Sequence, residues 1–205
     1  MPIVEHHSLS LGYETVNSDA TNWSLVRSRL DRFKIDTVYL SAGRAEWATT
    51  TWSAHPEYQA DSGVDRLAAA ISNVKTAADG STRNIVLMID AFVPSLIAAD
   101  PSLAGVKPDG SKNTYLVSAS ALLGSTGDLY TEYAAELARH FSPYMITYTE
   151  LLLDATSGAD DKALYKSMTG EDYPETGSPK IGAWRSQVMA QFLSRQFVRR
   201  PGRRV

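Results

Sequence analysis

Short apolar runs alternate along this chain with longer segments of helical period. Four runs rich in β-branched or aromatic residues predict β-strands, at residues 7–14, 35–42, 84–90 and 145–153. The second run, IDTVYLSA, is apolar throughout, which is typical of a strand covered on both faces. Strands separated by helical segments are the signature of βαβ units, so the pattern predicts an α/β fold.

The segments between these runs have apolar positions three or four residues apart, as in amphipathic helices. The first predicted helix follows an N-cap at Thr21 or Asn22, and its apolar stripe comprises Trp23, Val26, Leu30 and Phe33. Further helices are predicted at residues 63–78, 126–141, 160–169 and 181–196, the last with Trp184, Val188, Phe192 and Leu193 facing the core. Residues 94–113 carry three prolines and two glycines and predict a long irregular connection.

This order predicts four parallel strands in one sheet, with the loops after the strands along a single edge. A TIM (β/α)₈ barrel needs about 250 residues, so the chain is expected to form half of such a barrel, its first four strands. The alternative is a small open doubly wound sheet. Such a sheet normally binds a nucleotide at a G-x-G-x-x-G turn after its first strand, and residues 12–17 lack that pattern.

Residues 1–196 are expected to form a single βα-repeat domain, because 205 residues with 43% apolar content suit one compact core. Residues 197–205 form a basic tail, FVRRPGRRV, unlike anything before it. A fifth strand is due at this point of the repeat. The tail is therefore interpreted as out-of-frame sequence, with a genuine basic extension as the alternative.

Composition excludes several classes of function. A net charge of −3 and a pI near 5.8 give no electrostatic reason to expect a nucleic-acid partner. The absence of cysteine excludes disulfides, thiolate catalysis and cysteine-bound zinc. No run approaches the ~20 apolar residues of a membrane span, so no membrane partner is expected, and the compartment stays open.

Acidic residues mark the ends of the predicted strands. Glu150 lies within the apolar run MITYTELLLD, where a carboxylate is costly unless it is paired or faces a polar cleft. It is therefore the leading catalytic candidate, with a structural carboxylate bonded to an arginine or a backbone N–H as the alternative. Asp90 and Asp154 end their runs in the same way and are candidates for substrate binding, although either could equally cap the following turn.

Arg44, Glu46 and Trp47 follow the second predicted strand. A carboxylate beside an indole is suited to hold the hydroxyls and the apolar face of a sugar ring, so these residues are candidates for substrate binding. The alternative is a surface loop with an anchoring tryptophan. The four histidines lack the spacing of a metal site, and neither a metal nor another cofactor is expected.

Several segments together resemble glycoside-hydrolase-like (β/α)₈-barrel proteins of bacteria: AGRAEW, LMIDAFVPSLIAADPSLAGV, TYTELLLD, DDKALYKSMTGEDYP and IGAWRSQVMAQFLSR. The resemblance covers residues 12–196. It implies a carbohydrate-active barrel in which Glu150, closing the fourth strand, is the general acid/base of a longer parent enzyme. In that clan the glutamate usually follows an asparagine, whereas Thr149 precedes it here, and the partner carboxylate belongs to a seventh strand.

Glycosidic cleavage needs one carboxyl group to protonate the leaving oxygen and a second to attack or to activate water. With Glu150 alone one role is unfilled, so we expect the chain to bind carbohydrate without hydrolysing it. Two other functions remain open: a non-catalytic carbohydrate-binding or scaffold protein, and a small open-sheet protein that binds a phosphorylated ligand. Unpaired strands at the sheet edges also predict self-association.

Overall fold

The computed structural model describes residues 6–60 and 64–198. The chain divides into two compact units. The first comprises Met1–Asp90 and Glu136–Thr149, and the second comprises Ala91–Ala135 and Glu150–Val205. Each unit is described by itself.

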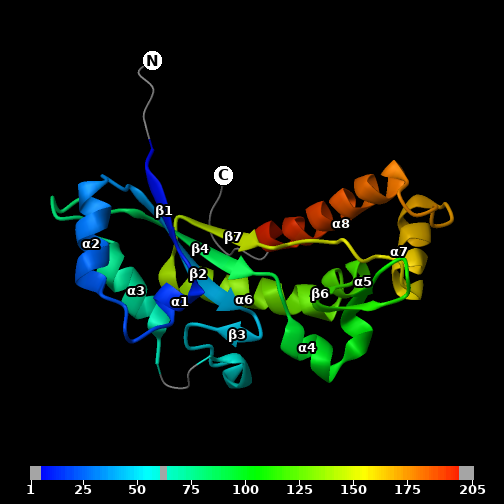
Figure 1. The fold of residues 1–205 in the computed structure, drawn as a ribbon, viewed down its shortest axis with the longest axis horizontal. Helices are drawn as coiled ribbons and strands as arrows, with labels where there is room; N and C mark the ends of the chain where they lie inside the picture. The colour runs from blue at the N-terminus through cyan, green and yellow to red at the C-terminus, as the bar shows by residue number, and fades with distance from the viewer. Residues whose placement is uncertain (1–5, 61–63, 199–205) are drawn as a thin grey trace, which may run out of the picture. The chain divides into compact units, whose positions relative to one another are not determined.

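The first unit contains a parallel sheet whose strand order is β1-β2-β4-β7, with one short antiparallel strand beside β2 (Figure 1). The strands are β1 (Ser8–Leu11), β2 (Thr37–Arg44), β3 (Trp47–Ala48), β4 (Asn84–Asp90) and β7 (Met145–Thr149). The predicted α/β class and the four parallel strands are therefore confirmed.

The sheet is open, and within the described residues its strands do not close into a barrel. In this respect it is closer to the open-sheet alternative than to half of a barrel. Its strand order follows the order of the chain, so it lacks the reversal that marks the switch point of a doubly wound sheet.

The strand boundaries differ from the prediction where the backbone leaves the extended conformation. β4 has the predicted bounds, and Val86, Leu87 and Ile89 within it are completely buried. β1 is shorter than predicted, because Gly12 is the N-cap of the short helix α1 (Tyr13–Val16). β7 ends at Thr149 rather than at residue 153, since Glu150 adopts the left-handed conformation, with φ 56°.

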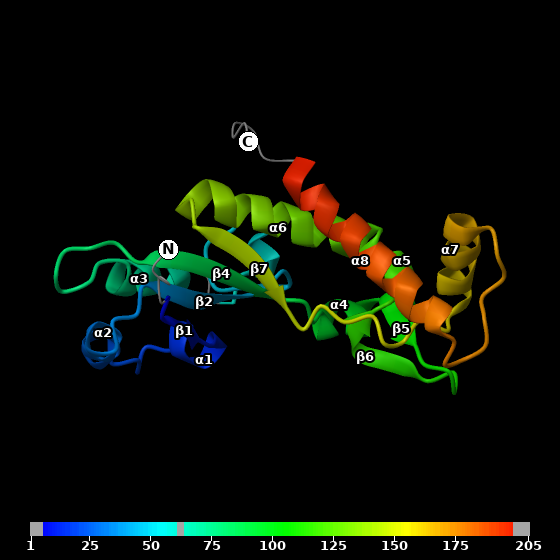
Figure 2. The same cartoon turned by 90° about the horizontal axis from the view of Figure 1, so that it is seen from above.

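Helices α2 (Trp23–Arg32) and α3 (Arg66–Val74) lie side by side (Figures 1 and 2). The side chain of Asn22 accepts a hydrogen bond from the backbone N–H of Leu25, 3.0 Å, which confirms the predicted N-cap of α2. Leu30 of the predicted stripe is buried, whereas Phe33, the C-cap residue that follows the helix, is 60% exposed. The 3₁₀ helix η1 (Pro56–Tyr58) precedes α3.

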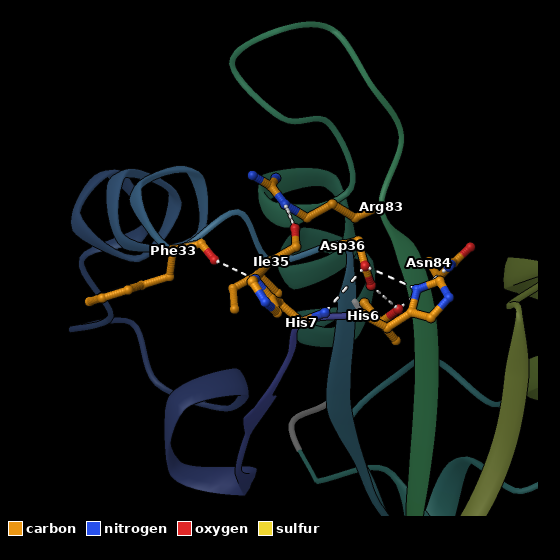
Figure 3. A network of polar contacts seen from close by, with 8 residues as sticks. His6, His7, Phe33, Ile35, Asp36, Arg83 and Asn84 are labelled. Atoms are coloured by element: carbon orange, nitrogen blue, oxygen red, sulfur yellow. Dashed lines mark hydrogen bonds and ion pairs between the residues drawn. The ribbon is translucent and has the colours of Figure 1, made fainter. Parts of the chain in front are cut away.

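A polar network joins the N-terminal ends of β1, β2 and β4 (Figure 3). The carboxylate of Asp36 accepts a hydrogen bond from the backbone N–H of His7, 3.3 Å, and lies 3.1 Å from Nδ1 of His6. Arg83 donates from Nε to the backbone oxygen of Ile35, 2.9 Å. This network is at the opposite end of the strands from the predicted site residues.

The second unit begins where an irregular connection was predicted, and that prediction is wrong. Residues 94–117 form α4 (Pro94–Ala99), η2 (Pro101–Leu103) and the antiparallel hairpin of β5 (Ala104–Val106) and β6 (Lys112–Val117). Two of the prolines start α4 and η2, where the missing N–H costs no hydrogen bond. Proline thus begins short elements here instead of excluding them.

Three of the remaining helices confirm the predicted periodicity: α6 (Ser125–Phe141), which contains residues of both units, α7 (Ala159–Thr169) and α8 (Pro179–Val198). The short helix α5 (Ala119–Leu122) was not predicted. Trp184, Val188 and Phe192 of α8 are buried as predicted, whereas Leu193 is 38% exposed. The predicted basic tail lies outside the described residues beyond residue 198. No helix in the described part of the chain is long and apolar enough to cross a bilayer.

Candidate functional site

Four residues lie in register across four neighbouring strands of the first unit. Trp47 of β3 pairs with Arg44 of β2, Arg44 pairs with Asp90 of β4, and Asp90 pairs with Thr149 of β7. We call this set, Trp47, Arg44, Asp90 and Thr149, the edge row. It occupies the C-terminal ends of the three parallel strands, and neighbouring strands are about 4.8 Å apart.

A tight turn after β2 brings Trp47 into the row. β2 reverses direction through Ala45 and Glu46, so that Gly43 pairs with Ala48 in the antiparallel strand β3. Gly43 has φ 76°, and a Cβ atom there would lie 2.3 Å from the backbone oxygen of Trp47. Only glycine fits this position, since other residues lack both the conformation and the space.

Glu46 is part of this turn, and its side chain is buried and paired with Arg44. Its side chain is 1% exposed, and its Oε1 atom is 3.4 Å from Nε of Arg44, whose side chain is 31% exposed. A buried carboxylate is tolerated when an opposite charge offsets its lost hydration. Glu46 therefore positions the guanidinium of Arg44 and is not itself open to a ligand, which refines its predicted role in sugar binding.

Asp90 ends β4 and accepts a hydrogen bond at Oδ1 from the hydroxyl of Thr149. Both side chains are half-buried. The bond fixes the orientation of the carboxylate, and a carboxylate has further lone pairs with which to accept hydrogen bonds. Asp90 is thus held in place and still able to accept from a ligand.

Trp47 is 42% exposed, and its indole ring is held by a hydrogen bond through its N–H. Its Nε1 atom donates a hydrogen bond to the hydroxyl of Tyr13, the first residue of α1. Asn17 in turn donates to the same hydroxyl, 2.8 Å. An indole fixed through its N–H offers a rigid apolar surface to a ligand at low cost in conformational entropy.

The edge row therefore combines an aromatic face, a guanidinium and an oriented carboxylate. In α/β proteins with parallel strands, ligand-binding residues gather at the carboxyl ends of the strands, where this row lies. The sheet has no topological switch point, so the position of the row is argued from the strand ends alone. The described residues contain no group of three or more histidine, cysteine, aspartate or glutamate side chains placed to hold a metal ion. The chemistry available to the row is hydrogen bonding, charge pairing and stacking.

Glu150 and Asp154 belong to the second unit, so the structure does not join them to the row. Glu150 is the first residue after β7 and is exposed, and the prediction that it lies inside an apolar strand is wrong. Asp154 is exposed too and does not end a strand; its backbone oxygen accepts from Arg185, 2.8 Å. The expected cost of burying Glu150 therefore does not arise.

Two contributors to the site were not predicted from the sequence. Tyr13 begins the short helix α1 just after the first strand, and its sequence there matches no motif. Thr149 precedes Glu150 and attracted no separate prediction. It lies beside Asp90 because Met145 pairs with Val86 rather than with the first residue of β4, and the apolar runs alone do not indicate this register.

Comparison with known proteins supports the fold and leaves the function open. No protein-family model matches the chain, and no curated protein matches it. A solved structure of a hypothetical protein from Ruminiclostridium thermocellum ATCC 27405 is similar, with a TM-score of 0.59 and 13% sequence identity. The match covers 96% of this chain and 93% of that one. The resemblance to glycoside-hydrolase-like barrels stays a prediction.

Proposed function

We propose that this protein binds carbohydrate at the edge row, without cleaving it there. The observation that supports the proposal is the register of Trp47, Arg44 and Asp90 across adjacent strands. The indole suits the apolar face of a sugar, and the guanidinium and carboxylate suit its hydroxyls as donor and acceptor.

Binding is favoured over hydrolysis by the partners of the two carboxylates. Glu46 is buried against Arg44, and Asp90 is bonded to Thr149. Cleavage needs two carboxyl groups that act on the glycosidic oxygen and on the anomeric carbon. Neither role is open to Glu46, because its side chain is 1% exposed.

Trp47→Ala tests the proposal directly. We expect millimolar affinity for members of a methyl glycoside panel, about −4 kcal/mol, and loss of that affinity in the variant because the stacking surface is removed. Tyr144→Ala is the matched control, since Tyr144 is 70% exposed and precedes β7 at the other end of the sheet. Titration calorimetry supplies the measurement. Equal affinity of Trp47→Ala and the wild type would refute the proposal.

A second candidate function is glycoside hydrolysis by Glu150, in a longer barrel of which this chain would form the first four strands. One observation favours it: Glu150 is exposed and has φ 56°, and non-glycine residues in this conformation are enriched at functional sites. Aryl glycosides incubated with the chain and with Glu150→Gln test this function, with Glu57→Gln as an exposed control. Turnover lost only in Glu150→Gln would support hydrolysis, whereas we expect no turnover from the chain itself.

A further inference from the structure

The second unit contains an open pocket of about 580 Å³ that the edge row does not involve. Four segments form its walls: the turn of the β5–β6 hairpin, the residues just before α7, one face of α7, and the loop after α7. The lining residues include Pro108, Ser157, Lys162, Ala163, Tyr173 and Glu175. The volume lies within the ~300–1,000 Å³ of typical small-molecule sites.

The walls of the pocket are held by hydrogen bonds and close packing. Val106 and Thr156 form a parallel β-bridge, and the N–H of Ser157 donates to the backbone oxygen of Val106, 2.7 Å. The ring of Tyr173 packs edge-on against Tyr165, with 5.3 Å between centroids, and against Trp184, with 6.1 Å. The pocket is therefore preformed, which lowers the entropic cost of binding.

The hydrogen bonds behind Tyr173 fix the direction of its phenolic proton. Nε and Nη2 of Arg185 donate to the hydroxyl oxygen of Thr156, at 3.0 and 2.8 Å, and so occupy both of its lone pairs. The hydroxyl of Thr156, 3.0 Å from that of Tyr173, must then act as the donor in this contact. The proton of the Tyr173 hydroxyl is thereby left for another acceptor.

The charges along the pocket balance. Lys166 pairs with Asp172, 2.8 Å, and Lys162 lies 6.0 Å from the centroid of the Tyr173 ring. Glu175 supplies a second carboxylate, so two ammonium groups face two carboxylates. A phosphate or other multiply charged anion needs a surplus of positive charge, and the pocket offers none. Donors and acceptors interspersed with Pro108 and Ala163 suit a neutral ligand.

We infer that this pocket binds a neutral, hydroxyl-rich small molecule of the size of a mono- or disaccharide. Lys162 and Tyr173 are the donors to its hydroxyl oxygens, and Glu175 is the acceptor from its hydroxyl protons. The inference does not rest on the edge row, because all the lining residues belong to the second unit. Either site can be correct without the other.

Amide chemical shifts locate the binding. We expect cellobiose to shift the amide signals of Ser157, Ala163 and Thr176 saturably, and inorganic phosphate to leave them unchanged. Tyr173→Phe, which removes one hydrogen bond, should weaken binding roughly 3- to 10-fold. Tyr115→Phe is the matched control, since Tyr115 is 46% exposed on β6 and does not line the pocket.

Lys162→Gln provides a second test that does not disturb the interior, because Lys162 is exposed. It should weaken binding by a similar factor and leave the melting temperature unchanged. Saturable shifts that persist in Trp47→Ala would separate this pocket from the edge row. Shifts produced by phosphate and not by cellobiose would overturn the neutral ligand class, and shifts produced by neither probe would overturn the site.

Discussion

Asp161 in the second unit is a buried carboxylate at the start of α7. It is 0% exposed and accepts a hydrogen bond at Oδ1 from the backbone N–H of Ser120, 2.9 Å. Its pKa is raised to about 6, chiefly by burial and to a smaller extent by the neighbouring Asp160, while the N–H groups of Ser120 and Ala119 and the charge of Arg185 oppose the shift. Ionisation of Asp161 is thus less favourable in the folded protein than in the unfolded chain.

This raised pKa predicts the pH dependence of stability. The stabilisation from protonated Asp161 is complete below its unfolded-state pKa of 3.8 and is lost as the pH rises through about 6. Relative to the wild type, Asp161→Asn should therefore gain about 2 kcal/mol in free energy of unfolding between pH 4 and pH 7. Urea unfolding at the two pH values measures the gain. Asp160→Asn is the control and should gain far less, and a constant difference between Asp161→Asn and wild type would contradict the prediction.

Three glycines predict three different effects of a methyl group. Gly43→Ala should cost more than about 2 kcal/mol, because the new Cβ would lie 2.3 Å from a backbone oxygen and φ is 76°. Gly80→Ala should cost about 1 kcal/mol, since its φ is 83° but nothing lies within 4 Å of the Cβ. Gly182→Ala, in α8 with open space around it, should stabilise by up to about 1 kcal/mol. Thermal unfolding of the three variants checks this order, and equal effects would contradict it.

At the residue scale, the sequence predicted which types of side chain follow the strands but not how they are used. Arg44, Glu46, Trp47 and Asp90 were all candidates, and the structure places them around one edge of the sheet. The burial of the Glu46 side chain could not be predicted, because it depends on the tight turn between β2 and β3, in which Gly43 has a left-handed conformation. Tyr13 was missed because its contact with Trp47 joins residues 34 positions apart.

Arg83 connects several elements of the first unit, and its side chain is 2% exposed. It donates to the backbone oxygens of Val74 and Thr76 at the end of α3, at 2.9 and 3.1 Å, and forms an ion pair with Asp31 of α2. With the bond to Ile35, also seen in Figure 3, it provides donors to three backbone carbonyl groups, of which that of Val74 is buried.

Arg83→Gln should therefore destabilise the protein by about 2 to 4 kcal/mol, because it removes the charged partner of Asp31 and the donor to the carbonyl groups. Arg139→Gln is the control: Arg139 is 70% exposed and pairs with Glu136 on the surface of α6, so a change below about 1 kcal/mol is expected. Chemical denaturation monitored by circular dichroism compares the two. Similar losses of unfolding free energy in the two variants would contradict the prediction that the buried contacts of Arg83 stabilise the protein.

At the element scale, the bounds of a strand were predicted correctly where its apolar run was flanked by polar residues. β4 has the predicted bounds because Asn84 and Asp90 flank an apolar run. β7 was extended too far, since the apolar residues 151–153 continue the pattern after the backbone has turned at Glu150. The elements of residues 94–117 were missed because each is only three to six residues long, too short for periodicity to show.

The first unit presents an open sheet edge at β1. Ser8, Leu9 and Ser10 are exposed, and Leu9 is exposed to 41%. We predict that the protein associates with itself at high concentration, because an unpaired edge strand can pair with another. Leu9→Lys should reduce the association by placing a charge on the edge, and Leu25→Lys on α2, where Leu25 is 47% exposed, should not. Sedimentation velocity over a range of concentrations measures it, and a wild type that stays monomeric throughout would refute the prediction.

At the scale of the whole molecule, the α/β class and the parallel strands were predictable because βα repetition dictates them. Closure into a barrel was not predictable, since it depends on the twist and stagger of strands rather than on their pattern. The division into two units has no signal in the sequence either, because one of its boundaries falls within α6.

The agreement between strand order and chain order has a consequence for synthesis on the ribosome. β1, β2 and β4 can pair as soon as residue 90 has emerged, whereas Thr149, which joins Asp90, follows 59 residues later. At roughly 5–20 residues per second, that interval is about 3 to 12 s. For those seconds the edge of β4 that later pairs with β7 has no neighbouring strand, although the other edge is paired with β2. A nascent chain paused in this interval should therefore be the form of the protein that holding chaperones recognise.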